Sequence, residues 1–168
     1  MNTLAALKPS FRPDGVIHAG NASQISDGAS AVLVASPERA AELGLTPIAR
    51  YHSGAVSGAD PLKMLTGPIP ATAKVLKRSG LSIGDIGAFE VNEAFAPVPL
   101  AWLGELGADP ERLNVNGGAI ALGHPLGMSG ARLALTATEE LQRSGGKLAL
   151  CTMCIGVGQG IAMIIERV

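Results

Sequence analysis

The sequence LALCTMCIGVGQGIAMIIERV, residues 148–168, contains two apolar runs on either side of a glycine-rich segment. The runs 148–153 and 161–166 have the length and composition of buried strands. The segment between them, 154–160, carries three glycines and is short enough to join neighbouring antiparallel strands. The end of the chain is therefore predicted to form a β-hairpin.

Helices and strands alternate upstream of this hairpin. A helix over 131–142 is predicted to end at Ser144-Gly145-Gly146, and Gly80 suits the end of an earlier helix. Ser36 is a suitable N-cap, with proline following at the first helical position. Such alternation predicts an α/β architecture with layers around a mixed sheet. The other expected elements are strands 29–35, 47–56 and 85–91 and helices 37–44, 70–79 and 100–106.

The composition excludes several classes of function. Charged residues make up 16 % of the chain, against roughly 25 % in ordinary soluble domains, which suggests that another chain or domain covers part of the surface. The net charge of −1 and the 3 % of aromatic residues argue against a nucleic-acid-binding face. No apolar run approaches the ~18 residues of a membrane span, and the N-terminus lacks signal-peptide features. These features predict a soluble, cytoplasmic protein.

Three segments place reactive side chains in loops, and Cys154 opens one of them. A thiol whose pKa is lowered by its surroundings can act as an acid or base near neutral pH. Gly156 and Gly158 allow backbone N–H groups to approach a negatively charged oxygen closely. A buried structural cysteine is the alternative, and for an isolated cysteine it is favoured. Cys151 lies inside the strand and is assigned that structural role.

The second such loop contains His124, between a glycine and a proline. A neutral imidazole there can donate a hydrogen bond to a carbonyl oxygen that becomes negative in a transition state. It could equally fill a turn at a helix entry. His18 and His52 have no acidic or cysteine neighbours, and such scattered histidines argue against a metal site.

The third loop, Asn92-Glu93-Ala94-Phe95-Ala96, follows a predicted strand. Asn92 could hold a water molecule or a substrate oxygen, although capping the next helix is its commoner role. Glu93 could be a general acid, but a carboxylate at this position more often makes a favourable contact with a helix dipole.

Two other cysteine and glycine patterns do not fit the functional motifs that they resemble. The pair Cys151-x-x-Cys154 resembles a redox dithiol, but that motif requires its first cysteine at a helix N-terminus. The glycines of 156–160 lack the dinucleotide-binding spacing, and a strand follows where a helix is required.

Taken together, these loops resemble the thiolase family. NVNGGAIALGHPLGMSGAR, residues 114–132, is similar to the family's long Gly-His-Pro signature. CIGVGQG at 154–160 is similar to its C-terminal cysteine motif, and NEAFA at 92–96 to a third motif. TGPIPA at 66–71 and AGNASQISDG at 19–28 extend the resemblance along most of the chain.

This resemblance implies a fold and a division of the chain. The fold is the C-terminal half of a two-half thiolase, a layered α/β/α structure with a five-stranded mixed sheet. Residues 1–44 would be a connector and the tail of the N-terminal half, and residues 45–168 the thiolase C-terminal domain.

The resemblance also implies catalytic roles at four positions. Cys154 matches the general acid/base that exchanges protons with the α-carbon of an acyl-CoA and with the CoA thiol. His124 matches a donor to the thioester oxygen, and Asn92 matches the residue that holds a water beside it. Gly156 matches one N–H of a second oxyanion hole. These roles reverse the preference for structural roles at Asn92 and Cys154.

Four further positions match the family's binding surfaces. Ser23, with Ala22, matches a contact to the pantetheine part of CoA. Ala94 and Phe95 match the wall beside the reacting thioester. No metal and no cofactor are implied, since coenzyme A is a substrate.

The acyl-accepting cysteine of the family has no counterpart here. The similarity covers only the end of the first half, residues 15–42, and the whole second half, and Met1 suggests a fragment, a split gene or an internal start. The chain is therefore expected to act on 3-oxoacyl-CoA and acetyl-CoA as an acyltransferase only with an N-terminal half, in an oligomer, and to be incomplete alone. The alternative is a non-catalytic subunit that binds CoA esters or has a structural role.

Overall fold

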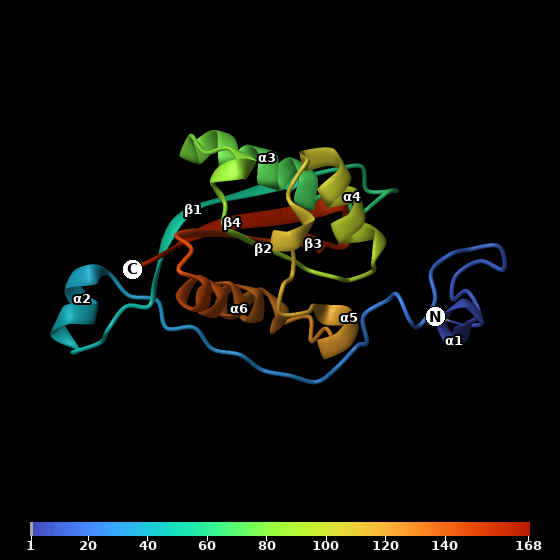
Figure 1. The fold of residues 1–168 in the computed structure, drawn as a ribbon, viewed down its shortest axis with the longest axis horizontal. Coiled ribbons are helices and arrows are strands. Elements are labelled where there is room, and N and C mark those ends of the chain that lie inside the picture. The colour runs from blue at the N-terminus through green and yellow to red at the C-terminus, as the bar shows by residue number, and fades with distance from the viewer. Residues whose placement is uncertain (1) are drawn as a thin grey trace.

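The computed structural model describes residues 2–168, and its centre is a four-stranded mixed sheet (Figure 1). The strand order is β1-β4-β3-β2. β4 pairs antiparallel with both β1 and β3, while β2 pairs parallel with β3. The predicted mixed sheet is thus confirmed. Its strands are β1 (Ala49–Gly58), β2 (Ala88–Val91), β3 (Leu148–Ile155) and β4 (Gln159–Arg167).

The predicted C-terminal hairpin is formed by β3 and β4. The last register pairs of the ladder join Cys154 to Gly160 and Ile155 to Gln159. A short 3₁₀ turn, Gly156–Gly158, closes the hairpin, with Val157 at φ 59° and Gly158 at φ 86°. Left-handed backbone of this kind suits glycine at 158 and is unusual for a β-branched valine.

Helices cover both faces of the sheet, which confirms the α/β/α layering (Figure 1). One face carries α3 (Pro68–Ser79) and α4 (Pro97–Leu106). The other carries α6 (Ser129–Ser144), with α5 (Ala119–Leu122) just before it. α1 (Asn2–Ala5) and α2 (Pro37–Glu42) lie outside these layers, and single 3₁₀ turns cover Ile83–Asp85 and Pro110–Arg112.

Two apolar cores lie between these layers. The core under α3 and α4 is centred on Trp102, whose indole N–H donates to Thr72 Oγ1 at 2.9 Å. The ring of Trp102 packs edge-on against Phe89, with 5.2 Å between ring centroids. The core under α6 is smaller and includes Leu133, Leu141 and Cys151.

The predicted helix ends have the expected physical causes. Ser36 caps α2 by accepting the Arg39 N–H at 3.2 Å. Gly80 ends α3 in the left-handed conformation, with φ 71°. The helices predicted at 70–79 and 100–106 begin earlier, at Pro68 and Pro97, because proline is well suited to the first helical turn.

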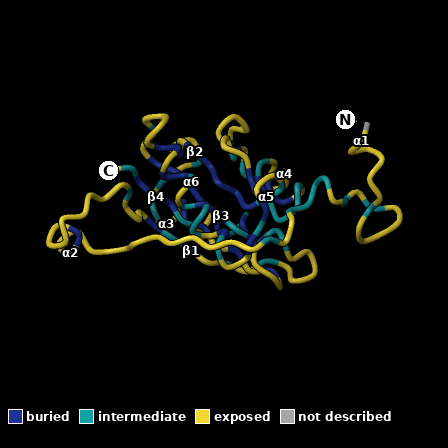
Figure 2. The backbone as a smooth tube through the Cα atoms, turned by 90° about the horizontal axis from the view of Figure 1, so that it is seen from below, coloured by how far each residue is buried: buried dark blue, intermediate teal, exposed yellow. Residues whose placement is uncertain are grey.

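The strand predicted at 29–35 is not formed, so the sheet has four strands rather than five. Residues 24–36 have no regular secondary structure and pass beside α6 toward α2 as an exposed strap (Figures 1 and 2). Val32, Leu33 and Val34 are 53 %, 77 % and 83 % exposed. The apolar composition that suggested a buried strand is real, but a strand also needs a hydrogen-bonding neighbour, and no strand of the described chain lies beside it.

Candidate active site

Asn92 and Cys154 lie at the same edge of the sheet. β2 and β3 are parallel, with Val91 opposite Thr152, so their carboxyl ends point the same way. The backbone N–H of Asn92 donates to Thr152 O at 3.0 Å, and Cys154 follows two residues later on β3. Parallel strands of this kind commonly place ligands beyond their carboxyl ends.

His124 reaches this edge from the segment between α5 and α6. Its Nε2 lies 3.4 Å from Asn92 Nδ2, and its Nδ1 lies 2.6 Å from Ser129 Oγ. Its backbone N–H donates to Gln24 O at 2.8 Å, so the strap holds this loop. Burial, aided by the charge of Arg132, lowers the pKa of His124 and favours a neutral imidazole.

Cys154 is buried, with 8 % of the residue exposed. Burial raises the pKa of this thiol, so in this chain Cys154 holds its proton at neutral pH. An acid or base role near neutral pH was predicted to need a lowered thiol pKa, and the surroundings within this chain act in the opposite direction. A protonated thiol is the form that can give a proton to a carbanion.

Gly156 lies at the exposed tip of the β3–β4 hairpin. A Cβ added there would meet no atom within 4 Å, so packing inside the chain does not explain the glycine. The backbone at this position is open to the approach of another group.

Glu93 is engaged in a structural clamp. Its carboxylate accepts hydrogen bonds from Asn114 Nδ2 at 3.0 Å and from the Ile120 N–H at 3.1 Å. Ile120 belongs to the first turn of α5, so the contact is the expected favourable one with a helix N-terminus, although the helix is α5 and not α4. Gly118 is in direct contact with this carboxylate and leaves no room for a Cβ. Both oxygens of Glu93 are occupied, which argues against a general acid.

Asn114 was not singled out from the sequence, although it connects the same two loops. Its amide pairs with the backbone of Val91 like a neighbouring strand, accepting the Val91 N–H at 2.8 Å and donating to Val91 O at 2.9 Å. Its left-handed backbone, φ 46°, is one that asparagine tolerates better than most residues.

The four expected binding residues lie together. Ala22 forms an isolated bridge with Phe95. Ser23 donates to Ala94 O twice, from its backbone N–H at 3.1 Å and from its hydroxyl at 3.0 Å. The residues directly before the strap are therefore joined to the 92–96 loop beside the carboxyl ends of β2 and β3.

A buried pair of charged residues lies behind this edge. Glu90 on β2 is 2 % exposed, and its Oε2 has no hydrogen-bond partner within the described residues. Burial raises the pKa of Glu90 to about 7, against the opposing effect of Arg132. The guanidinium nitrogens of Arg132 are buried and likewise have no partner in residues 2–168. Cys151 is nearby and its thiol pKa is raised strongly by burial, as its structural assignment predicts.

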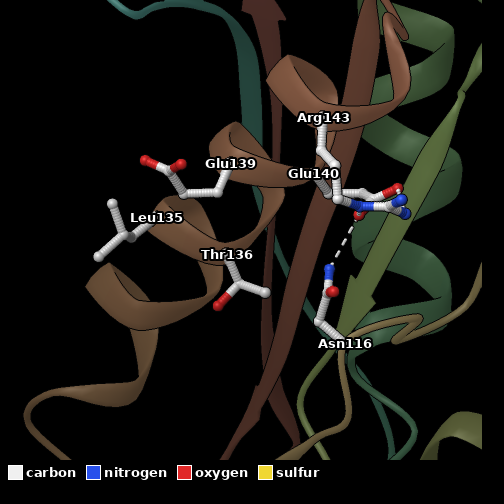
Figure 3. Close-up of a pocket in the computed structure, with 6 residues that line it drawn as sticks. All are labelled: Asn116, Leu135, Thr136, Glu139, Glu140 and Arg143. Carbon is white, nitrogen blue, oxygen red and sulfur yellow. Dashed lines mark hydrogen bonds and ion pairs between the residues drawn. The ribbon is translucent and has the colours of Figure 1, made fainter.

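Two surface hollows lie away from Cys154, His124 and Asn92. One of them, of about 510 Å³, lies between α6 and Asn116 (Figure 3). There Glu140 binds Asn116 at 3.0 Å and Arg143 at 2.8 Å, so its carboxylate is already engaged. The smaller lies beside Glu93 and Leu100.

Residues 2–168 contain neither a metal-binding cluster nor a membrane-spanning helix. No group of three or more His, Cys, Asp or Glu side chains there is placed to hold a metal ion. None of the helices in the described range is both long and apolar enough to cross a membrane.

Comparison with known proteins settles the family. The model of the thiolase C-terminal domain matches residues 45–167, and that of the thiolase N-terminal domain matches residues 1–38. The chain belongs to the thiolase family. Among curated proteins, this thiolase-family chain is 59 % identical to the 3-oxoadipyl-CoA/3-oxo-5,6-dehydrosuberyl-CoA thiolase of Escherichia coli K12. It is 56 % identical to the 3-ketoacyl-CoA thiolase of Aliivibrio salmonicida.

Solved thiolase structures share the fold. Human mitochondrial 3-ketoacyl-CoA thiolase superposes with a TM-score of 0.97 at 50 % identity, and its complex with CoA with 0.96. The match covers 99 % of this chain and 42 % of those chains. The curated relatives are covered to 42 % and 43 % of their length, while the match takes in 100 % and 98 % of this chain. This thiolase-family chain therefore spans less than half the length of the relatives it matches.

Proposed function

We propose that this chain supplies the proton-transfer and oxyanion side of a thiolase reaction on 3-oxoacyl-CoA and acetyl-CoA. The main support for this proposal is that the side chains of Asn92, His124 and Cys154 come from three segments that lie at the same edge of the sheet. Asn92 directly follows β2, Cys154 lies near the carboxyl end of the adjacent parallel strand β3, and His124 Nε2 lies 3.4 Å from Asn92 Nδ2. A thioester enolate needs both a donor at oxygen and a proton-transfer group at carbon, and these residue types suit those two tasks.

The nucleophile has to come from outside this chain. Cleavage through a covalent acyl intermediate requires an activated thiolate. Cys151 is unsuited because it is buried, its pKa is raised, and its thiol contacts Leu133 O at 3.6 Å. Cys154 is already assigned to proton transfer. We infer that an N-terminal thiolase half, in an oligomer, carries the acyl group.

The cleavage then has two steps. The partner's thiolate adds to the 3-oxo carbon, and the bond from this carbon to carbon 2 breaks with its electron pair passing to the acetyl-CoA enolate. His124 and a water held by Asn92 stabilise the enolate oxygen, and Cys154 gives its proton to carbon 2. Cys154 then takes the proton of a CoA thiol, which attacks the acylated partner and releases its thiolate. The Gly156 N–H would stabilise the oxyanion of the acyl group.

The same proposal covers the ligand. Ala22, Ser23, Ala94 and Phe95 would line the approach of the CoA arm, and no cofactor other than this substrate is needed. The description of one similar solved structure, the human mitochondrial thiolase in complex with CoA, supports this ligand class. A cytoplasmic location stays a prediction from composition.

Thiolysis of acetoacetyl-CoA tests the proposal. The chain is assayed alone and after mixing with the N-terminal part of the Escherichia coli relative, and turnover is expected only in the mixture. Cys154→Ser should lower kcat by roughly 10²–10⁴-fold, since it removes the proton-transfer group. Turnover by the chain alone would refute the missing nucleophile. If the mixture binds CoA esters without turnover, the chain is instead a non-catalytic CoA-ester-binding subunit.

A further inference from the structure

The proposed role of His124 requires its hydrogen at Nε2, since Nδ1 is turned toward Ser129 and Nε2 is the ring nitrogen on the side of Asn92. A neutral imidazole carries a single N–H, and the partner of one ring nitrogen decides where it resides. Nε2 lies 3.4 Å from the Asn92 amide nitrogen, beyond the ~2.7–3.2 Å of good N–H hydrogen bonds. This contact is too long to fix the tautomer. The closer contact at Nδ1 has to do so.

That closer contact is with Ser129, the first residue of α6. Ser129 is fully buried, and its Oγ lies 2.6 Å from His124 Nδ1. The same oxygen lies 3.0 Å from Pro125 O, so its single hydrogen has two possible acceptors. If the hydroxyl donates to Pro125 O, His124 Nδ1 must carry the imidazole hydrogen, and Nε2 cannot donate to a substrate.

The carbonyl of Pro125 is already satisfied. It accepts the backbone N–H groups of Met128 and Ser129, both at 3.0 Å. A carbonyl oxygen has two lone pairs, and these two donors occupy them. The shorter contact of the hydroxyl is with His124 Nδ1, and this nitrogen offers a free lone pair when the imidazole hydrogen is at Nε2.

We propose that Ser129 is the positioning residue for His124, donating its hydroxyl hydrogen to Nδ1 and thereby holding the imidazole as the Nε2–H tautomer that can donate to a thioester oxygen. This rests on the proposed function only for its consequence in catalysis. The hydrogen-bond arrangement itself belongs to this chain. Ser129 is well placed for it, because the packing of α6 against β2 and β3 fixes its backbone.

The tautomer is measured on the whole chain by long-range ¹H–¹⁵N correlation spectra of the imidazole nitrogens. The unsubstituted chain should show a pyridine-like Nδ1 and a pyrrole-like Nε2 for His124. Ser129→Ala should move the two shifts toward one another, because both tautomers become populated. Thr138→Val is the matched control. It removes a hydroxyl group of the same helix, one that donates to Ala134 O at 2.8 Å, and it should leave both ¹⁵N shifts of His124 unchanged.

A protonated Nδ1 in the unsubstituted chain would overturn the proposal, and so would unchanged shifts in a folded Ser129→Ala chain. If that variant does not fold, the tautomer of the unsubstituted chain still decides. In the thiolysis mixture, Ser129→Ala should lower kcat roughly ten- to a hundred-fold, with KM within about twofold, because the donor is misplaced while binding contacts remain. Complete absence of turnover with the unsubstituted chain would count against the proposed function and leave the tautomer result standing.

Discussion

Individual side chains at the sheet edge divide into those that face the open site and those buried behind it. His124 and Cys154 are held near neutrality by burial, which suits exchange of protons and hydrogen bonds with a neutral thioester. Glu90 is buried behind the sheet edge, and its raised pKa also favours the neutral form, although the proposed chemistry does not use this residue. At the residue scale, then, burial perturbs groups with and without a proposed role, and a raised pKa alone does not identify a catalytic residue.

Glu90 gives a prediction on stability against pH. Its pKa rises from 4.5 to about 7 on folding, so the folded chain binds the proton more tightly than the unfolded chain. The free energy of unfolding should therefore fall as pH rises from about 4.5 to about 7, by up to about 3 kcal/mol from this residue. Glu90→Gln should remove that part of the slope, as measured by urea unfolding at several pH values. Glu139→Gln, on the exposed side of α6, is the control, and an equal loss of slope there would contradict the prediction.

At the scale of elements, two loops are joined by the carboxylate of Glu93. It bonds Asn114 and the first turn of α5, while Gly118 provides the space for it. These contacts connect the 92–96 loop, which carries Asn92, with the segment 114–124, which ends at His124. The distance between those two side chains thus depends on a clamp that touches neither of them.

Gly118→Ala tests this clamp. The added Cβ would overlap the Glu93 carboxylate, and we expect a loss of about 1–3 kcal/mol in the free energy of unfolding. Gly104→Ala is the control, because a Cβ there meets nothing within 4 Å and alanine favours a helix by about 0.5–1 kcal/mol. The double variant Glu93→Ala/Gly118→Ala should lose less than the sum of its single variants. Strict additivity of the two losses would show that the clash does not occur.

The elements also show how far the sequence could predict this molecule. The β3–β4 hairpin and the ends of α2 and α3 follow from local signals, namely apolar runs, Ser36 and Gly80, and they were predicted. So were the loops with Asn92, His124 and Cys154. The contact of Ser129 with His124 was not predicted, and for Glu93 a helix N-terminus was predicted as the partner but not which helix. Both contacts join segments whose relative placement depends on the register of β2 and β3 and on the turn before α6. No local periodicity encodes that placement.

At the scale of the whole molecule, the side of the chain that carries the strap has uncovered apolar residues. The strap 24–36 leaves Val32, Leu33 and Val34 largely exposed on the α6 side, and Leu135 on α6 is 46 % exposed. The incorrect strand at 29–35 has the same origin, since its side chains have the composition of a buried element but no covering surface in this chain. The low charge content agrees with a covering partner, and the proposed N-terminal half is the one that the chemistry requires.

Binding of that half should therefore stabilise the chain. A partner that binds only the folded state at 100 times its Kd adds about 2.7 kcal/mol to the free energy of unfolding, so the thermal midpoint should rise with the concentration of the added half. Val34→Lys should weaken this effect, because it places a charge on the surface to be covered, while leaving the midpoint of the chain alone unchanged. Leu100→Lys, on the α4 side and also exposed (65 %), is the matched control. If Leu100→Lys reduces the stabilisation more than Val34→Lys does, the partner covers the α4 face instead of the strap and α6.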